Sequence, residues 1–198
     1  MNKKLTGYWI SNFYFLCMML VAAVVNAGAP QFIPTDAEIK YLPAYCAAKL
    51  RGVDEQRWRA MIGGDFQHLH HMCYAQNAKR KALSAREEKS RKYLYSVALK
   101  NYEYMETHAD KDFILRPAIY IEKAGVFRSL KQNKKAEEYY LKAIEFKPDY
   151  AKAYAEYSGF LKRTGQKERA IKILEQGLVV NPNSKSLKRR IKKLRDRK

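Results

Sequence analysis

A short run of histidine and cysteine is the part of this sequence best suited to chemistry. His68, His70, His71 and Cys73 fall close together, and Cys46 comes well before them in the chain. At helical spacing His70 and Cys73 lie on one face, so Cys46, His70 and Cys73 could together ligate zinc or copper. The same two cysteines could instead form a disulfide or remain free thiols. The spacing by itself leaves these three outcomes open.

The first residues have the form of a secretory leader. Lys3 and Lys4 form a basic head, residues 10–25 are mostly apolar, and small residues precede a cleavage position after Ala27. The apolar run is shorter than the roughly 20 residues that a membrane span needs. The sequence therefore predicts that residues 1–27 are a cleaved signal peptide and that the protein is periplasmic or secreted. An uncleaved N-terminal membrane anchor is the alternative.

The predicted compartment affects which state of the cysteines is expected. Cys17 leaves with the leader, and two cysteines that remain in an oxidising compartment usually pair. We therefore predict a disulfide between Cys46 and Cys73, which would be worth about 3 kcal/mol. The alternative is the metal site of Cys46, His70 and Cys73.

Catalytic signatures are missing from the sequence. It contains no Gly-x-Ser-x-Gly nucleophile elbow, and the pair Gly63-Gly64 lacks the lysine of a phosphate-binding loop. We predict a protein that is not an enzyme and that needs no cofactor.

Charge points to anionic partners. The formal net charge is +19, and loss of Lys3 and Lys4 with the leader lowers it by two, to +17. Such a field attracts acidic proteins, anionic lipid or acidic glycan, while export argues against nucleic acid as the partner. The end of the chain is dominated by Lys and Arg, with Asp196 as its acid and an apolar edge of Leu187, Ile191 and Leu194. Residues 185–198 are predicted as a basic capping helix.

Helices are expected to position these groups. Residues 28–64 are predicted as a linker and short helices, split at Pro43. Residues 65–116 are predicted as a divergent helical pair, in which Asp65 caps the first helix and Ser84 caps the second.

Large and small side chains then recur at a fixed interval along the chain. The first set is Tyr120, Ala124, Phe127, Ala136, Tyr140, Ala143 and Pro148, and the second is Tyr154, Ser158, Leu161, Ala170, Leu174, Gly177 and Pro182. This interval resembles the period of the tetratricopeptide repeat, a helix–turn–helix unit of about 34 residues. The resemblance implies two repeats over residues 117–184 and an all-α fold, a short α-solenoid of antiparallel helix pairs with the basic C-terminal capping helix. Asn133 and Gly165 are expected to take left-handed conformations in the turns between paired helices.

The resemblance also implies a binding surface. In this family the first helix of each repeat lines a concave groove, and the positions that match here are Ile121, Gly125, Arg128, Ala155, Gly159 and Lys162. Arg128 and Lys162 would give the groove a positive potential suited to an acidic or C-terminal carboxylate peptide. Chaperone-binding members of the family hold a peptide carboxylate with paired Lys and Asn. This chain has Ile121 and Gly125 at those places, so that specific function is not implied.

The sequence thus predicts a non-catalytic scaffold or adaptor of a bacterial-type cell envelope, which binds a protein or acidic peptide in its groove. Two alternatives stay open. One is a zinc- or copper-binding module built on the Cys/His cluster, and the other is a tether to anionic lipid or glycan through the basic C-terminal helix.

Overall fold

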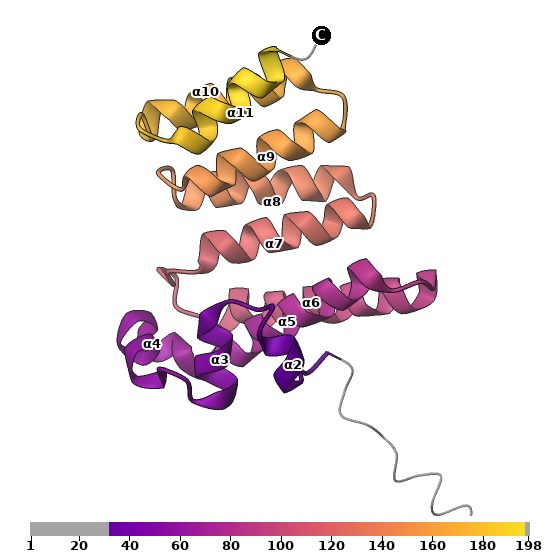
Figure 1. Ribbon diagram of the computed structural model, residues 1–198, viewed down its shortest axis with the longest axis vertical. Coiled ribbons are helices and arrows are strands. Elements are labelled where there is room, and N and C mark those ends of the chain that lie inside the picture. Colours follow the sequence, from indigo (N-terminus) through magenta and orange to yellow (C-terminus); the bar gives the residue numbers. More distant parts are fainter. Residues whose placement is uncertain (1–31, 197–198) are drawn as a thin grey trace, which may run out of the picture.

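A computed structural model of the protein describes residues 32–196, and the predicted signal peptide lies outside the described residues. The helices are α2 (Asp36–Ile39), α3 (Ala44–Arg51), α4 (Glu55–Ile62), the 3₁₀ segment η1 (Gly63–His68), α5 (Leu69–Ser84), α6 (Glu88–His108), α7 (Arg116–Ser129), α8 (Asn133–Phe146), α9 (Ala151–Arg163), α10 (Lys167–Val180) and α11 (Lys185–Arg195). Figure 1 shows them stacked from α2–α4 at one end to α11 at the other. Between residues 32 and 196, no helix is long and apolar enough to cross a membrane.

The all-helical prediction is confirmed, because every regular element of residues 32–196 is a helix. The pairing also follows the prediction: α5 lies against α6, α7 against α8 and α9 against α10. Short loops join the partners of each pair, so the partners are antiparallel. Successive pairs then stack in one direction (Figure 1), as in an α-solenoid.

Short helices α2, α3 and α4 cover the N-terminal end of this stack. Pro43 separates α2 from α3, as predicted, and Gly52 ends α3 with a φ of +73°. Glu38 fixes α2 to α5, because its carboxylate pairs with Arg80 (3.2 Å) and Lys81 (3.0 Å). Burial would raise the pKa of Glu38, but hydrogen bonds to its carboxylate, the first of them from a backbone N–H, hold that pKa at about 2.

Two predicted helix starts are wrong. Asp65 does not cap α5; it lies in η1, where its buried carboxylate accepts a hydrogen bond from the backbone N–H of Asp110 (3.0 Å). Ser84 is the last residue of α5, and its hydroxyl donates to the carbonyl of Lys81 (3.1 Å). In both cases the polar side chain bonds elsewhere than at the start of the predicted helix. Asp65 bonds to a backbone group distant in the sequence, and Ser84 bonds to a carbonyl of the preceding turn.

The turns inside the two later helix pairs agree with one prediction and differ from another. Gly165 has a φ of +78°, as predicted, but Asn133 is the first residue of α8. The left-handed residue of that turn is Lys131, with a φ of +60°. Lys131 lies one full repeat period before Gly165, so the period, rather than residue type, fixes where the chain turns.

The terminal helix α11 has the predicted form. The Ser184 hydroxyl accepts from the N–H of Leu187 (3.4 Å), and Leu187, Ile191 and Leu194 are buried. Basic side chains cover the other faces, so α11 closes the C-terminal end of the stack with one apolar edge.

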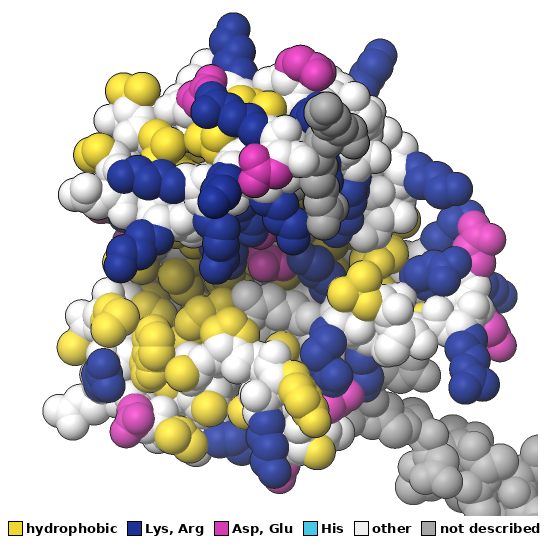
Figure 2. Space-filling model, turned by 45° about the horizontal axis from the view of Figure 1, so that its top comes forward, with side chains coloured by type: hydrophobic (Ala, Val, Ile, Leu, Met, Phe, Trp, Pro, Cys, Tyr) yellow, Lys and Arg dark blue, Asp and Glu magenta, His cyan; other side chains and the backbone are white. Residues whose placement is uncertain are grey.

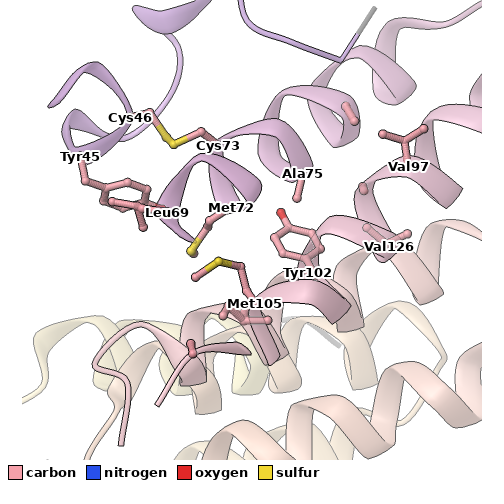
Figure 3. Packing of buried hydrophobic residues seen from close by; sticks show 14 of the residues in the cluster. Tyr45, Cys46, Leu69, Met72, Cys73, Ala75, Val97, Tyr102, Met105 and Val126 are labelled. Carbon is pink, nitrogen blue, oxygen red and sulfur yellow. A yellow bond between two sulfur atoms is a disulfide. The ribbon is translucent and has the colours of Figure 1, made fainter. Parts of the chain in front are cut away.

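Two hydrophobic cores run through the molecule, and α7 belongs to both. Its Ile119 and Val126 join the core of α3, α5 and α6, while Ala124 and Phe127 join the core that extends from α7 to α11. Figure 3 shows the first core, which includes Met72, Tyr102 and Met105 and contains the Cys46–Cys73 bond on the side of α3.

A buried ion pair joins the two halves. The Lys123 ammonium on α7 bonds the Glu106 carboxylate on α6 and lies 4.4 Å from the centre of the Tyr139 ring. Burial would lower the pKa of Lys123, but the hydrogen bond to Glu106 raises it above its ordinary value, so the ammonium stays charged. Nearby, the Arg116 guanidinium donates to the carbonyls of Ala109 (2.8 Å) and Asp110 (2.6 Å). These contacts fix the angle between α6 and α7.

Candidate functional site

The inner face of the stack is formed by the first helix of each pair. Neighbouring contacts run from α5 to α7, from α7 to α9 and from α9 to α11. We call the surface across these four helices the groove. Figure 2 shows it as a hollow in the middle of the molecule, with Lys and Arg side chains along its upper border.

Of the six predicted groove residues, three are buried: Ile121, Gly125 and Ala155. Ile121 and Ala155 are each 5% exposed and belong to the second core, so they support the groove without offering much surface. Gly125 and Gly159 leave space that cationic side chains occupy. A Cβ at Gly125 would lie 3.0 Å from the Lys79 ammonium, and one at Gly159 would lie 3.5 Å from the Arg163 guanidinium.

Cations gather at the C-terminal end of the groove. We call the five residues involved the cationic end: Arg128, Lys162, Arg163, Arg190 and Lys193. Lys162, Arg190 and Lys193 line a pocket of about 140 Å³ together with Ser158, Gly159 and Leu194. In the described part of the chain, none of these five side chains forms an ion pair with a carboxylate. The cationic end therefore holds charge that no ion pair among the described residues neutralises.

The arginines of the cationic end affect one another. Burial, together with the charges of Arg128 and Arg190, lowers the pKa of Arg163, and the one carboxylate that opposes this effect belongs to Glu156. The Nε of Arg128 is buried and has no hydrogen-bond partner within residues 32–196. Guanidinium groups arranged in this way bind carboxylates in bidentate geometry, and binding relieves their mutual repulsion.

The family comparison identifies the middle of the stack, from α7 to α10. The family model of the tetratricopeptide repeat matches residues 117–150 and 151–184. Residues 117–184 are two tetratricopeptide repeats. The first repeat comprises α7 and α8, and the second comprises α9 and α10. Arrays of such repeats present extended concave surfaces to other proteins, so this part of the chain is a protein-interaction scaffold.

Solved structures with tetratricopeptide repeats are also similar to the chain. The Arabidopsis OM64 TPR domain is 22% identical, with a TM-score of 0.39, over 65% of this chain and 99% of that one. The first TPR of Spaghetti (RPAP3) bound to the HSP90 peptide SRMEEVD is 23% identical, with a TM-score of 0.42, over 61% of this chain and 92% of that one. The comparison with curated protein sequences gave no match.

Sequence reasoning missed three members of the cationic end. Arg163 directly follows the predicted Lys162, and its position one helical turn after Gly159 places it over that glycine. Arg190 and Lys193 come from α11, outside the repeats. Their spacing of three residues indicates that they share one face of a helix. Which face of α11 meets the groove, however, depends on how Leu194 packs.

The cysteines form a disulfide in the structure. Cys46 on α3 and Cys73 on α5 are joined, with both residues fully buried. Each sulfur is bonded to the other, so neither is available as a thiolate ligand for the alternative Cys46, His70 and Cys73 metal site. The His70 Nδ1 faces the carbonyl of Gln67 instead (3.1 Å). Among the described residues, no three His, Cys, Asp or Glu side chains are arranged to hold a metal ion.

The histidines gather around Tyr104 of α6, a residue that the sequence analysis did not single out. The His71 ring stacks on one face of Tyr104, with centroids 3.7 Å apart, and His108 stacks at 3.9 Å. His68 lies at the edge, 5.7 Å from Tyr104. The intervals of three residues from His68 to His71 and of four from Tyr104 to His108 were signals that could have indicated this cluster.

Hydrogen bonding sets the tautomer of His71, and burial sets the direction of its pKa shift. The Asn101 amide nitrogen donates to a backbone carbonyl, so its oxygen faces His71 and accepts from Nδ1 (2.8 Å). Burial lowers the pKa of His71, although the Asn101 bond opposes this, and burial and the His71 charge lower the pKa of His70. Both rings are therefore mainly neutral at neutral pH, which disfavours ion pairing here.

Proposed function

We propose that the protein is a non-catalytic, exported scaffold that binds an acidic segment of a partner protein in its groove. The observation that supports this proposal most is the cationic end. There Arg128, Arg163 and Arg190 lie near one another, and none of them forms an ion pair within the described residues. An acidic segment supplies the carboxylates that this surface lacks. The two tetratricopeptide repeats, together with α11, provide the rigid helices that hold the guanidinium groups in place.

Charge reversal at the cationic end tests this proposal. We expect the double variant Arg163→Glu and Arg190→Glu to bind a fluorescein-labelled, amidated peptide with a four-glutamate block at least about tenfold more weakly than the wild type. Fluorescence anisotropy at fixed ionic strength measures the affinity. Arg163 and Arg190 lie on helix surfaces, so the helical circular dichroism should not change.

A matched control carries the same change of net charge. Lys134→Glu and Lys172→Glu alter exposed lysines on α8 and α10, away from the groove. This control should bind the acidic peptide within about twofold of the wild type. Equal weakening of both double variants, or equal binding of a glutamine peptide of the same length, would show that only net charge acts and would remove the groove from the proposal.

The location in a bacterial-type envelope is part of the proposal and rests on the sequence of residues 1–27. We expect the chain, expressed in full in a bacterium, to be recovered from the periplasm or medium with the mass of a protein that begins at Gly28. Mass spectrometry of the intact protein measures this directly. Recovery of the uncut chain from the cytoplasm would contradict export, and recovery of the uncut chain from the membrane would support the anchor.

The tether to anionic lipid or glycan remains a second proposal, because α11 contributes to the groove as well as to the basic outer surface. Arg195 on that helix pairs with Glu175 (2.6 Å), but most of its other cations face solvent. Since α11 buries its apolar edge of Leu187, Ile191 and Leu194 in the second core, its lipid-facing surface contains little hydrophobic area for insertion.

A further inference from the structure

A pocket of about 340 Å³ lies at the side of the stack, between the first two turns of α6 and the turn that follows α7. Figure 1 shows the start of α6 and the end of α7 on the same side of the stack. We call this cavity the side pocket, and it is lined by Glu88, Arg91, Lys92 and Tyr95 of α6 and by residues 129–131. None of these residues belongs to the cationic end, so the side pocket is a separate site.

Two cations of the side pocket have no carboxylate partner. Lys92 pairs with Glu88 (2.7 Å), whereas neither Arg91 nor Lys131 forms an ion pair within residues 32–196. Three cations and one carboxylate leave the pocket with a net charge of +2. A ligand with two negative charges would neutralise it.

The effect of these cations on Glu88 shows that they lie close together. A hydrogen bond from Lys92 lowers the pKa of Glu88 below its ordinary value. The charges of Arg91 and Lys131 act in the same direction, although one residue belongs to α6 and the other to the turn after α7. Both cations therefore lie near one carboxylate and near each other.

A buried tyrosine gives the side pocket a hydroxyl that the protein itself does not use. Tyr95 is 2% exposed and lines the pocket, and its hydroxyl has no hydrogen-bond partner among the described residues. Buried hydroxyl groups are normally hydrogen-bonded. The Ser129 hydroxyl differs, because it already donates to the carbonyl of Gly125 (3.0 Å). The Tyr95 O–H is therefore the neutral donor that remains for a ligand.

The backbone of Lys131 adopts a conformation that is costly for a residue with a side chain. Its φ is +60°, and the residue one repeat period later, Gly165, has a φ of +78°. Glycine adopts this left-handed region readily, whereas a Cβ is strained there. Strained residues of this kind are concentrated at functional sites. The turn alone would favour glycine, so the lysine needs another reason, and its charge in the pocket supplies one.

The two helix ends at the side pocket also favour an anion. The side chain of Glu87, at the N-cap of α6, makes no capping hydrogen bond, so the positive end of that helix is not neutralised by a side-chain cap. The carbonyls of Val126, Phe127 and Arg128 at the end of α7 already accept from backbone N–H groups of the following turn. The negative end of α7 is therefore partly satisfied.

We propose that the side pocket binds a phosphate monoester. Such an ester carries a charge of about −1.5 to −2 at neutral pH, which matches the net charge of the pocket, and it has three strong acceptor oxygens. The guanidinium of Arg91, the ammonium of Lys131 and the hydroxyl of Tyr95 supply the donors. The volume is in the range of about 300–1,000 Å³ that is typical of small-molecule pockets, so a small organic group fits beside the phosphate. This site is independent of the proposed function.

Calorimetric titration with glycerol 3-phosphate tests the proposal. We expect the disulfide-bonded protein to bind one equivalent at a fixed ionic strength, at least about fivefold more tightly than it binds succinate. Succinate is a dianion of similar size whose charge lies on two separate carboxylates. Equal affinity for succinate would show that the pocket selects charge alone and would overturn the assignment to phosphate.

Charge variants locate the binding. Arg91→Gln and Lys131→Gly should each weaken glycerol 3-phosphate binding at least about tenfold. Lys172→Gln removes one charge from α10, outside the pocket, and should bind within about twofold of the wild type. Lys131→Gly should also raise the midpoint of thermal unfolding by about 2–4 °C, because glycine relieves the positive φ. A variant that is more stable and yet binds less cannot have lost binding through unfolding.

A hydroxyl variant tests the role of Tyr95. Tyr95→Phe should weaken the binding of glycerol 3-phosphate about tenfold without lowering the midpoint of thermal unfolding, because the hydroxyl has no partner among the described residues. Tyr93→Phe is the matched control, since Tyr93 is an exposed residue of α6 that does not line the pocket. The control should bind as the wild type does.

Vesicles distinguish a free ester from a lipid headgroup with the same chemistry. Sedimentation with phosphatidylcholine vesicles that contain phosphatidic acid, if it occurs with the wild type and not with Lys131→Gly, would support the proposal with the lipid as the source of the phosphate. Binding of glycerol 3-phosphate without such sedimentation would support it with a soluble ester as the source.

Two results would overturn the proposal. One is the failure of the wild type to bind the monoester in either form, and the other is binding that Lys131→Gly and Tyr95→Phe leave unchanged. The Arg163→Glu and Arg190→Glu variant should bind glycerol 3-phosphate within about twofold of the wild type, because it leaves the side pocket intact. Failure of this site and failure of the acidic-segment groove are therefore distinguishable.

Discussion

Replacing Cys46 and Cys73 together with alanine is expected to lower the free energy of unfolding by about 3 kcal/mol. The disulfide closes a loop with a sequence separation of 27, and its loss gives the unfolded chain conformations that the bond forbids. It also frees α3, which otherwise lies fixed on α5 (Figure 3). Urea unfolding followed by the fluorescence of Trp58 measures the change, because this ring packs on Tyr45 of α3 (centroids 5.8 Å apart).

Reduction of the wild type provides the matched control. With a reductant present, the wild type should unfold at nearly the same urea concentration as the double variant, while the variant should not respond to the reductant. A chain that begins at Gly28 has Trp58 as its one tryptophan, so the signal reports this region. Equal stability of oxidised and reduced wild type would show that the bond adds nothing and would contradict the prediction.

Gly177→Ala is expected to lower the free energy of unfolding by about 2 kcal/mol, although alanine is the better helix former. Gly177 is buried in α10, and a Cβ there would lie 2.7 Å from Cγ and 2.9 Å from Cβ of Tyr154 on α9. The Leu187 side chain of α11 closes the remaining side at 3.0 Å. Because the tyrosine Cβ is fixed to its backbone, α10 must move away from α9.

Gly159→Ala is the matched control for this substitution. Gly159 also lies inside a helix, but a Cβ there would meet the flexible end of Arg163 at 3.5 Å, an ordinary contact. Its helix propensity should therefore dominate and leave the protein as stable as the wild type, or more stable by up to about 1 kcal/mol. Opposite signs for the two variants in thermal unfolding support the packing argument. A stabilised Gly177→Ala would contradict it.

The repeats were predictable because their signal is periodic and extends over two complete units. The close approach at Gly177 was also visible, since it stands one repeat period after Ala143, at a position reserved for small side chains. Local capping signals were less reliable. Ser84 and Asp65 are residue types that cap helices, yet the bond from Asp110 to Asp65 joins residues far apart in the sequence, which no local pattern contains.

The groove was predictable in outline and not in its surface chemistry. The repeat positions located Arg128, Gly159 and Lys162 on or beside the inner face. They could not show that Ile121 lies below it, because burial there depends on contacts between α7 and α9. The pocket lined by Tyr41 and Leu83 was hidden for the same reason, because these residues are distant in the sequence and line one pocket only after α2 and α3 fold over α5.

The sharing of α7 between two cores has a consequence for cooperativity. Neither half of the molecule can melt without exposing one apolar side of α7, so each half stabilises its neighbour through a common interface. The disulfide strengthens one half, whereas the other ends at α11, which rests on a narrow apolar edge. Unfolding should therefore begin as fraying at the C-terminus and travel toward α7. The cationic end would lose its order before the helices joined by the disulfide do.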